Sequence, residues 1–169
     1  MAITSKREQI IERIRTVVLP LINGTGNYNF LQKKISRKWF EPTELNAIDY
    51  PALMIIEDGM TIFKPLTAQE YTLGSQSLDL TDAMRIGIAG FVKVEKSSSN
   101  VVGTEINKLM SDIIIAMHVD TRLNGLCDSV VLTSAVHSMD FSESDGIGLV
   151  IVMFGIKYDF NPRASTPST

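Results

Sequence analysis

The sequence predicts an α+β fold, in which two amphipathic helices pack on a mainly antiparallel sheet and long loops project from the body. Residues 10–21 and 101–119 each repeat apolar side chains at helical spacing. Residues 130–141 and 148–160 are rich in β-branched and aromatic side chains, and the polar segment between them is typical of a β-hairpin. These four segments define the helices and the best-supported part of the sheet.

The length and composition of the chain fit one folded domain followed by a short tail. The 169 residues are 44% hydrophobic and 21% charged, which is ordinary for a globular protein. We expect residues 1–160 to form the domain. Residues 161–169 are rich in Pro, Ser and Thr, so we expect them to be disordered in isolation.

The first predicted helix begins after a capping sequence and ends at a proline. Ser5 and Glu8 have the spacing of a capping box, in which each side chain satisfies a free backbone N–H group. Apolar residues then recur at helical spacing: Ile10, Ile11, Ile14, Val17, Val18 and Leu21. Pro20 should end or kink the helix near Leu19, because it lacks an N–H donor and its ring clashes with the preceding turn.

Residues 23–50 lack strong periodicity and contain several turn-forming residues, so they are predicted to form a long loop. Trp39 and Phe40 lie in this segment, and two interpretations are open. In the first, residues 35–40 form a short strand that covers one edge of the core. In the second, the two aromatic side chains anchor a neighbouring subunit, since tryptophan is enriched at the centres of interfaces.

A second polar segment, residues 67–76, is also predicted to project from the body of the domain. Together with the C-terminal tail, it gives the chain further arms that could reach a neighbouring molecule. The candidate subunit-interface residues are Trp39, Phe40, Gln69 and Tyr71.

A buried strand and a turn are predicted in the middle of the chain. Residues 50–56 form an apolar run of strand length, with Pro51 near its tolerated opening position. Asp58 and Gly59 then supply a hairpin turn signal, and residues 60–65 follow as a candidate return strand.

A long strand and the second helix follow. Residues 84–95 alternate in the period of two expected of a half-buried strand. Gly87 and Gly90 within it indicate a bulge, a bend or the close approach of another part of the chain. Residues 101–119 place one wide apolar stripe on a helix, with Asp112 among the polar residues that flank it.

No recognisable catalytic or cofactor-binding motif is present in the sequence. Cys127 is the only cysteine and lies in no nucleophile signature. The two histidines, His118 and His137, lack a metal-binding spacing. We therefore predict no enzyme activity, no metal and no cofactor. The alternative is a small enzyme or ligand-binding domain with a site assembled from His137, Asp140 and Glu143 near the C-terminal hairpin.

Charge and hydropathy favour neither nucleic-acid binding nor a membrane span. The net charge is −3, whereas proteins that hold nucleic acid through its phosphates carry a basic surface. The densest basic stretch is best explained as a solvated face; it consists of Lys33, Lys34, Arg37 and Lys38. No apolar run approaches the ~20 residues that cross a bilayer, and residues 1–12 lack the apolar core of a signal peptide.

The predicted elements follow one another along the chain in the order helix, irregular loop, strands, helix and closing hairpin, and particular segments carry this order. They are residues 10–21, Tyr50-Pro51-Ala52, Met84-Arg85-Ile86-Gly87-Ile88, residues 101–117, residues 120–126 and Lys157-Tyr158-Asp159-Phe160. In this order and with these segments, the chain resembles the phage tail terminator family, which includes the lambda minor tail protein U and its myophage relatives. The resemblance covers roughly residues 7–160.

The resemblance implies a structural virion protein of the phage tail and neck, made in the cytoplasm of a bacterial host. Such a protein forms a homohexameric ring at the head-proximal end of the tail tube, ends tube polymerisation and forms the joint to the neck. Its partners would be further copies of itself, the tail tube protein, a neck or head-completion protein and, where one exists, the tail sheath. DNA would pass through the lumen without specific binding. A neck or head-completion ring subunit, with twelvefold symmetry as one option, is the nearest alternative.

Overall fold

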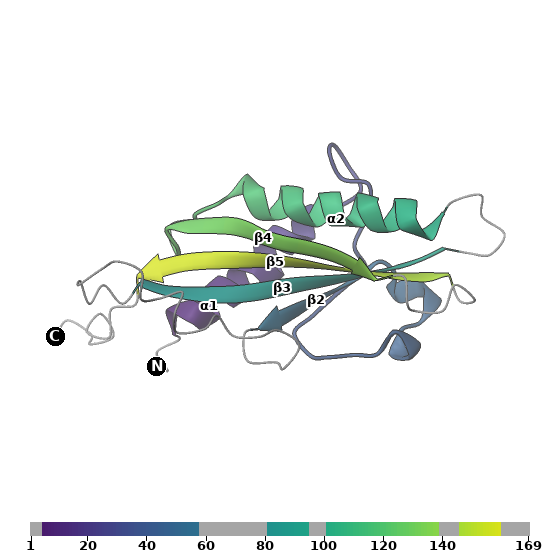
Figure 1. Cartoon of the computed structure of the whole chain (residues 1–169), viewed down its shortest axis with the longest axis horizontal. Helices are drawn as coiled ribbons and strands as arrows, with labels where there is room; N and C mark the ends of the chain where they lie inside the picture. Colours follow the sequence, from purple (N-terminus) through teal and green to yellow (C-terminus); the bar gives the residue numbers. More distant parts are fainter. Residues whose placement is uncertain (1–4, 58–80, 95–100, 139–145, 160–169) are drawn as a thin grey trace.

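A computed structural model of the chain describes residues 5–57, 81–94, 101–138 and 146–159. Within these ranges, five strands form one sheet in the order β1-β2-β3-β5-β4. The strands are β1 Lys34–Ser36, β2 Ala52–Glu57, β3 Thr81–Lys93, β4 Ser129–Ser138 and β5 Ile147–Asp159. The helices are α1 Lys6–Arg13 and α2 Val102–Val119, and α2 lies along one face of the sheet (Figure 1). The predicted α+β class is confirmed.

The sheet is mixed rather than purely antiparallel. The pairing of β1 with β2 is parallel, whereas β2 with β3, β3 with β5 and β5 with β4 are antiparallel. The parallel pair follows from the connection, because the chain leaves β1 and returns through two 3₁₀ turns, Pro42–Glu44 and Ala47–Asp49, which form a crossover and not a tight hairpin. The predicted turn at Asp58-Gly59 and the return strand 60–65 lie outside the described residues.

The C-terminal hairpin is confirmed, with one irregularity. The strands β4 and β5 pair antiparallel, and the register shifts between Leu132 and Ser134, so Thr133 is an extra residue in β4. Such a bulge reverses the alternation of side chains along the strand. In a regular strand His137 and Val131, six residues apart, would lie on the same face of the sheet. The bulge places them on opposite faces.

The first helix begins at Ser5, whose hydroxyl oxygen accepts a hydrogen bond of 3.2 Å from the Glu8 N–H. This is one half of the predicted capping box. The Glu8 carboxylate, which would complete the box by accepting the Ser5 N–H, binds the guanidinium of Arg37 instead. A long-range ion pair therefore replaces the local capping bond.

Pro20 changes the helix rather than ending it abruptly. After α1, the chain continues as a π-helical turn, Ile14–Val18, and a 3₁₀ turn, Leu19–Leu21. The Leu19 N–H bonds to the carbonyl of Ile14, five residues back. The wider turn accommodates the proline, which cannot donate a hydrogen bond and whose ring crowds the carbonyl four residues earlier.

The main core lies between the sheet and the two helices, on what we call the helical face of the sheet. Here α2 approaches β3 and β5 closely at two glycines: a Cβ at Gly90 would lie 2.7 Å from a Leu109 methyl group, and one at Gly148 would lie 2.5 Å from Ile106. The close approach of α2 thus explains why residue 90 is glycine. Close approach was one of the three explanations that the sequence left open, beside a bulge and a bend. None of the described helices is long and apolar enough to cross a membrane.

A smaller core lies on the opposite side of the sheet, which we call the second face. Its side chains come from β2, β3 and the segment after β1, and they are Phe40, Leu45, Ala52, Met54, Ile56, Ala89 and Phe91. The segment that carries Phe40 and Leu45 therefore covers part of this face rather than projecting into solvent.

The segment before β1 is also tied to the body. Asp112 of α2, predicted on the polar flank of the helix, is fully buried and accepts hydrogen bonds from the main-chain N–H groups of Asn29 and Phe30. Further on, the Lys33 N–H bonds to the Pro51 carbonyl at 3.0 Å. These contacts tie parts of the segment 23–50 to the body, so a single long projecting loop over these residues is not confirmed. The predicted projecting segment 67–76 and the predicted tail 161–169 lie outside the described residues.

Candidate subunit interface

The two aromatic residues predicted to anchor a neighbour have different surroundings. The Phe40 ring packs on Phe91 of β3, with 5.3 Å between ring centroids, and is buried in the core of the second face. The Trp39 side chain is 45% exposed. Trp39 is thus the one that presents a large apolar surface to solvent. The other two candidate residues, Gln69 and Tyr71, lie outside the described residues.

A turn after β1 directs the Trp39 side chain. The Ser36 hydroxyl accepts the Lys38 N–H at 3.0 Å and donates to the Lys38 carbonyl at 2.9 Å. This turn ends the strand at Ser36, so the predicted strand over residues 35–40 is shorter than expected. The indole Nε1 of Trp39 then donates a hydrogen bond of 3.0 Å to Glu41 Oε1. The polar edge of the indole therefore has a partner within the same segment.

Arg37 fixes the base of the same turn. Its guanidinium donates to the carboxylates of Glu8 and Glu12 and, at 2.7 Å, to Glu57 at the end of β2. The hydrogen bond from Arg37 lowers the pKa of Glu8, and the bond from Arg15 lowers the pKa of Glu12. The bonds to Glu8 and Glu57 raise the pKa of Arg37. This network joins α1, the residue after β1 and the end of β2.

Trp39 borders a shallow groove on the second face, which we call the Trp39 groove. Its lining is apolar apart from one carboxylate and consists of Trp39, Glu41, Pro42, Met54, Ile56, Ala89, Phe91, Leu149 and Ile151. The groove holds about 30 Å³, far below the roughly 300 Å³ of common small-molecule sites. This shape suits contact with another protein surface rather than enclosure of a small molecule.

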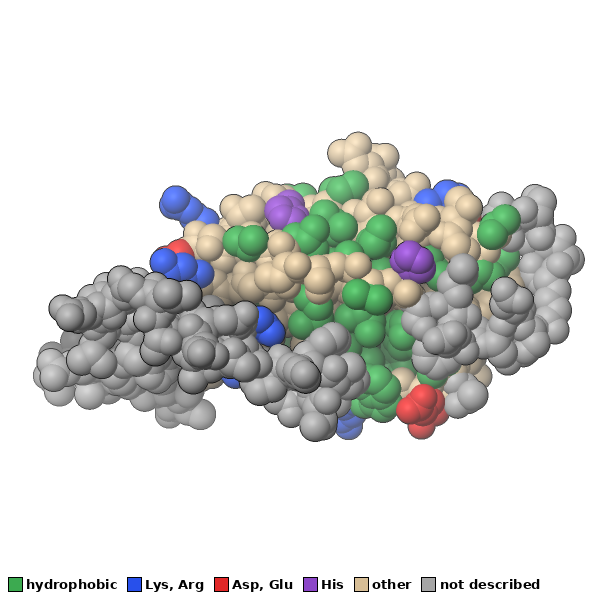
Figure 2. Space-filling view, in the orientation of Figure 1, with side chains coloured by type: hydrophobic (Ala, Val, Ile, Leu, Met, Phe, Trp, Pro, Cys, Tyr) green, Lys and Arg blue, Asp and Glu red, His purple; other side chains and the backbone are tan. Residues whose placement is uncertain are grey.

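The outer strand β4 is a second exposed apolar feature. Val131 is 54% exposed and Val136 is 59% exposed. Figure 2 shows hydrophobic side chains exposed on this side of the molecule. Sequence patterning predicted the strand but not its place at the end of the sheet, because strand order depends on pairing between distant segments. The one local signal is that residues 129–138 contain no Asp, Glu, Lys or Arg.

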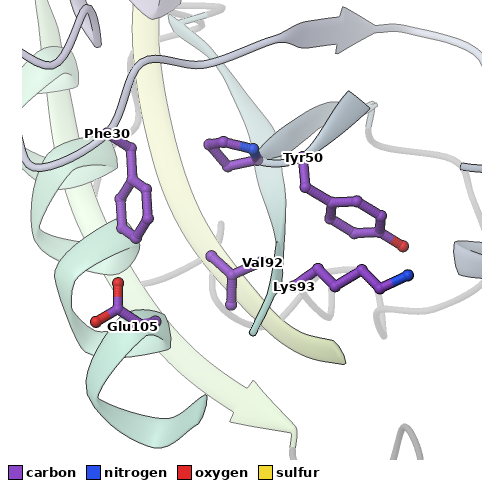
Figure 3. A pocket seen from close by; sticks show the side chains of 6 residues that line it. Phe30, Tyr50, Val92, Lys93 and Glu105 are labelled. Atoms are coloured by element: carbon purple, nitrogen blue, oxygen red, sulfur yellow. The ribbon is translucent and has the colours of Figure 1, made fainter. Parts of the chain in front are cut away.

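A separate cavity of about 210 Å³ lies between α2, the segment before β1 and the end of β3 (Figure 3). It is lined by Phe30, Tyr50, Pro51, Val92, Lys93 and Glu105. The Glu105 carboxylate is bound by Lys108 Nζ at 2.8 Å, and the Lys93 ammonium lies 5.9 Å from the centroid of the Tyr50 ring. Both charged groups already have partners, and the volume is below the roughly 300 Å³ of common small-molecule sites.

Comparison with known proteins gives no family assignment. No family model matches the chain, and no curated protein matches its sequence.

One residue of the alternative small-molecule site lies in the described part of the chain. His137 is exposed on β4, whereas Asp140 and Glu143 lie outside the described residues. At the end of α2, His118 Nδ1 lies 2.8 Å from a main-chain carbonyl. Burial raises the pKa of the Cys127 thiol to about 11, which disfavours the reactive thiolate. Over the described ranges, no three His, Cys, Asp or Glu side chains are grouped to hold a metal ion.

Proposed function

We propose that the chain is a structural subunit of a ring that caps the head-proximal end of a phage tail tube. In this role it ends tube polymerisation and forms the joint to the neck. The observation that carries the proposal is the exposed Trp39 at the rim of an apolar groove. An exposed tryptophan beside such a groove is typical of a protein–protein contact, because an indole contributes a large contact area at little cost in conformational entropy.

The ring requires a head-to-tail contact, in which one patch of a subunit meets a different patch of the next. The Trp39 groove supplies one of these patches. It is fixed to the body on both sides, by the Arg37 network and by the packing of Phe40 on Phe91. A stable contact buries at least about 1,000 Å² in total, so the groove is the centre of a larger surface. The assignment of six copies comes from the resemblance to tail terminators.

The same proposal defines the partners. The ring would bind the tail tube protein on one side and a neck or head-completion protein on the other, and in a contractile tail it would also meet the sheath. DNA would cross the lumen without specific binding, which the net charge of −3 favours. The protein would be a component of the virion, and it needs no covalent chemistry to recognise a tube end.

Electron microscopy of tail tubes assembled with the full chain tests this function. We expect negative-stain images to show a ring at one end of each tube and tubes of limited length when the chain is present. The variant Trp39→Ala should leave tube ends open. The variant Ile48→Ala removes a side chain that is 81% exposed and does not line the groove, so it should cap tubes as the wild type does.

Two outcomes speak against this assignment. A chain that never binds tube ends, with or without Trp39, would reject the capping function. A ring with twelve copies in class averages, bound to head structures rather than to tubes, would favour the neck or head-completion subunit instead.

A further inference from the structure

The edge strand β4 carries a second surface for self-association. It forms one end of the sheet and, within the described residues, pairs with β5 alone. We propose that two copies of the chain pair β4 with β4, antiparallel about a twofold axis, and so join their two sheets. This contact goes beyond the proposed ring, and it uses none of the residues that line the Trp39 groove.

The sequence of β4 lacks the usual protection of an edge strand. Natural sheet edges are commonly very short or carry lysine, other charges or proline. The ten residues Ser129–Ser138 include no Asp, Glu, Lys, Arg or Pro. At the other end of the sheet, β1 has only three residues. The first of them is Lys34, and Lys33 and Lys38 flank the strand. Of the two edges, β4 is therefore the one that suits a partner strand.

The bulge at Thr133 brings two exposed valines to the same face. Residues five apart in a regular strand point to opposite faces. Here Val131 is paired with Gly155 and Val136 with Ile151, which are four residues apart on β5 and share the second face. The extra residue thus places both valines where a partner strand can meet them together.

This arrangement makes β4 complementary to itself. If Val131 of one copy lies opposite Val136 of the other, the pairs are Ser129–Ser138, Val130–His137, Val131–Val136, Leu132–Ala135 and Thr133–Ser134. Each of the four outer pairs joins residues that lie on the same face of the sheet. Hydroxyl residues meet at the centre, the apolar pairs Val131–Val136 and Leu132–Ala135 lie beside it, and Val130 meets His137 beyond them. A twofold contact requires this kind of self-complementarity.

The lack of charge on β4 favours a second copy as the occupant. Two copies bring together the same neutral strand, so no like charges meet across the axis. Two Val131–Val136 pairs form per dimer, and cross-strand pairs of β-branched residues stabilise antiparallel sheets. A charged strand from another protein would find no opposite charge along this edge.

Sedimentation velocity of the full chain tests the contact. We expect the wild type to form a dimer that dissociates on dilution. The double variant V131K/V136K places lysines opposite each other twice in the dimer and should raise its Kd by about 30-fold. The charge-swap variant V131K/V136E places each lysine opposite a glutamate of the other copy and should return the Kd to within about threefold of the wild type. Within one chain the two positions lie opposite β5 residues that are four apart, about 13 Å along the strand, which is too far to form a pair.

A matched control adds the same charge elsewhere. The variant I48K/V119K changes two side chains that are also exposed and should dimerise like the wild type. Far-UV circular dichroism and thermal melting of all variants establish that they are folded. A wild type that stays monomeric at the highest attainable concentration overturns the proposal, as does a V131K/V136K dimer of unchanged affinity or a V131K/V136E variant without recovery. If the wild type never dimerises and V131K/V136K loses binding to tubes, the edge strand binds the tube protein instead. That result would also overturn the proposed dimer.

Discussion

The main-chain N–H of Asn29 donates hydrogen bonds of 2.9 and 3.0 Å to the two carboxylate oxygens of Asp112, which is fully buried on α2. The Asn29 side-chain amide and the Phe30 N–H complete the set of donors, at 2.7 and 2.9 Å. The carboxylate thus accepts the hydrogen bonds that these N–H groups would otherwise donate to water. It fixes the segment before β1 against the helix.

Replacement of Asp112 by asparagine should lower the free energy of unfolding by about 2–3 kcal/mol. The amide keeps one acceptor oxygen but turns an NH₂ group toward other donors, so at least one buried donor loses its partner. Urea unfolding measures the change. The control Asp128→Asn alters an exposed carboxylate and should change stability by less than about 0.5 kcal/mol. Equal effects of the two substitutions would show that the Asp112 bonds contribute little.

Asp112 also shows where prediction from the sequence reached its limit. The helical periodicity of residues 101–119 correctly predicted α2, and it placed Asp112 on the flank of the apolar stripe. The donors that permit its burial come from Asn29 and Phe30, more than eighty positions away. Local spacing holds no information about such a partner.

The same difference between local signals and long-range contacts applies to the sheet and to the candidate interface. Alternation and turn chemistry predicted β2, β3, β4 and β5, because these signals act over a few residues. The parallel pairing of β1 and the position of β4 at the edge depend on which distant strands meet, as does the burial of Phe40 on Phe91. Trp39 was identified from residue type alone, whereas the groove beside it is assembled from three strands and the segment after β1.

Gly148 should tolerate no larger side chain, because α2 lies directly above it. A Cβ there would come within 2.5 Å of Ile106 and 2.8 Å of a Val102 methyl group. We expect Gly148→Ala to lower the free energy of unfolding by about 1–3 kcal/mol, as overpacked cores do. Gly155→Ala is the matched control on the same strand, since its Cβ would meet only Thr133 Cγ2 at an ordinary 3.4 Å. Thermal or urea unfolding of both variants compares them, and a smaller loss for Gly148→Ala would contradict the close packing of α2.

The Arg37 network should make stability depend on pH on the acid side. Arg37 holds the pKa of Glu8 below its ordinary value of 4.5, so the bond stabilises the fold above that pH and is lost as pH falls through the lowered pKa. Removal of the guanidinium in Arg37→Met should therefore cost most near neutral pH, and the gap to the wild type should narrow below about pH 4.5.

Urea unfolding of both proteins between neutral and acid pH measures that gap. Arg122→Met is the control, because Arg122 is exposed and lies outside the network. Its stability relative to the wild type should change little with pH. A gap for Arg37→Met that stays constant down to the lowest pH would mean that packing of the side chain, and not its charge, stabilises this corner.

Trp39 is the only tryptophan in the chain, so its fluorescence reports directly on the proposed ring contact. In the free chain the indole is 45% exposed and its N–H is bound by Glu41. Burial against a neighbouring subunit should shift its emission to shorter wavelength and protect it from acrylamide quenching when the chain is mixed with tail tubes. Pairing through β4 leaves the Trp39 groove uncovered, so dimerisation alone should change neither signal. The variant V131K/V136K, in which pairing through β4 is weakened, should still show the blue shift on tubes. An emission spectrum that stays unchanged on tubes decorated with rings would place Trp39 outside the contact and move the interface to another surface.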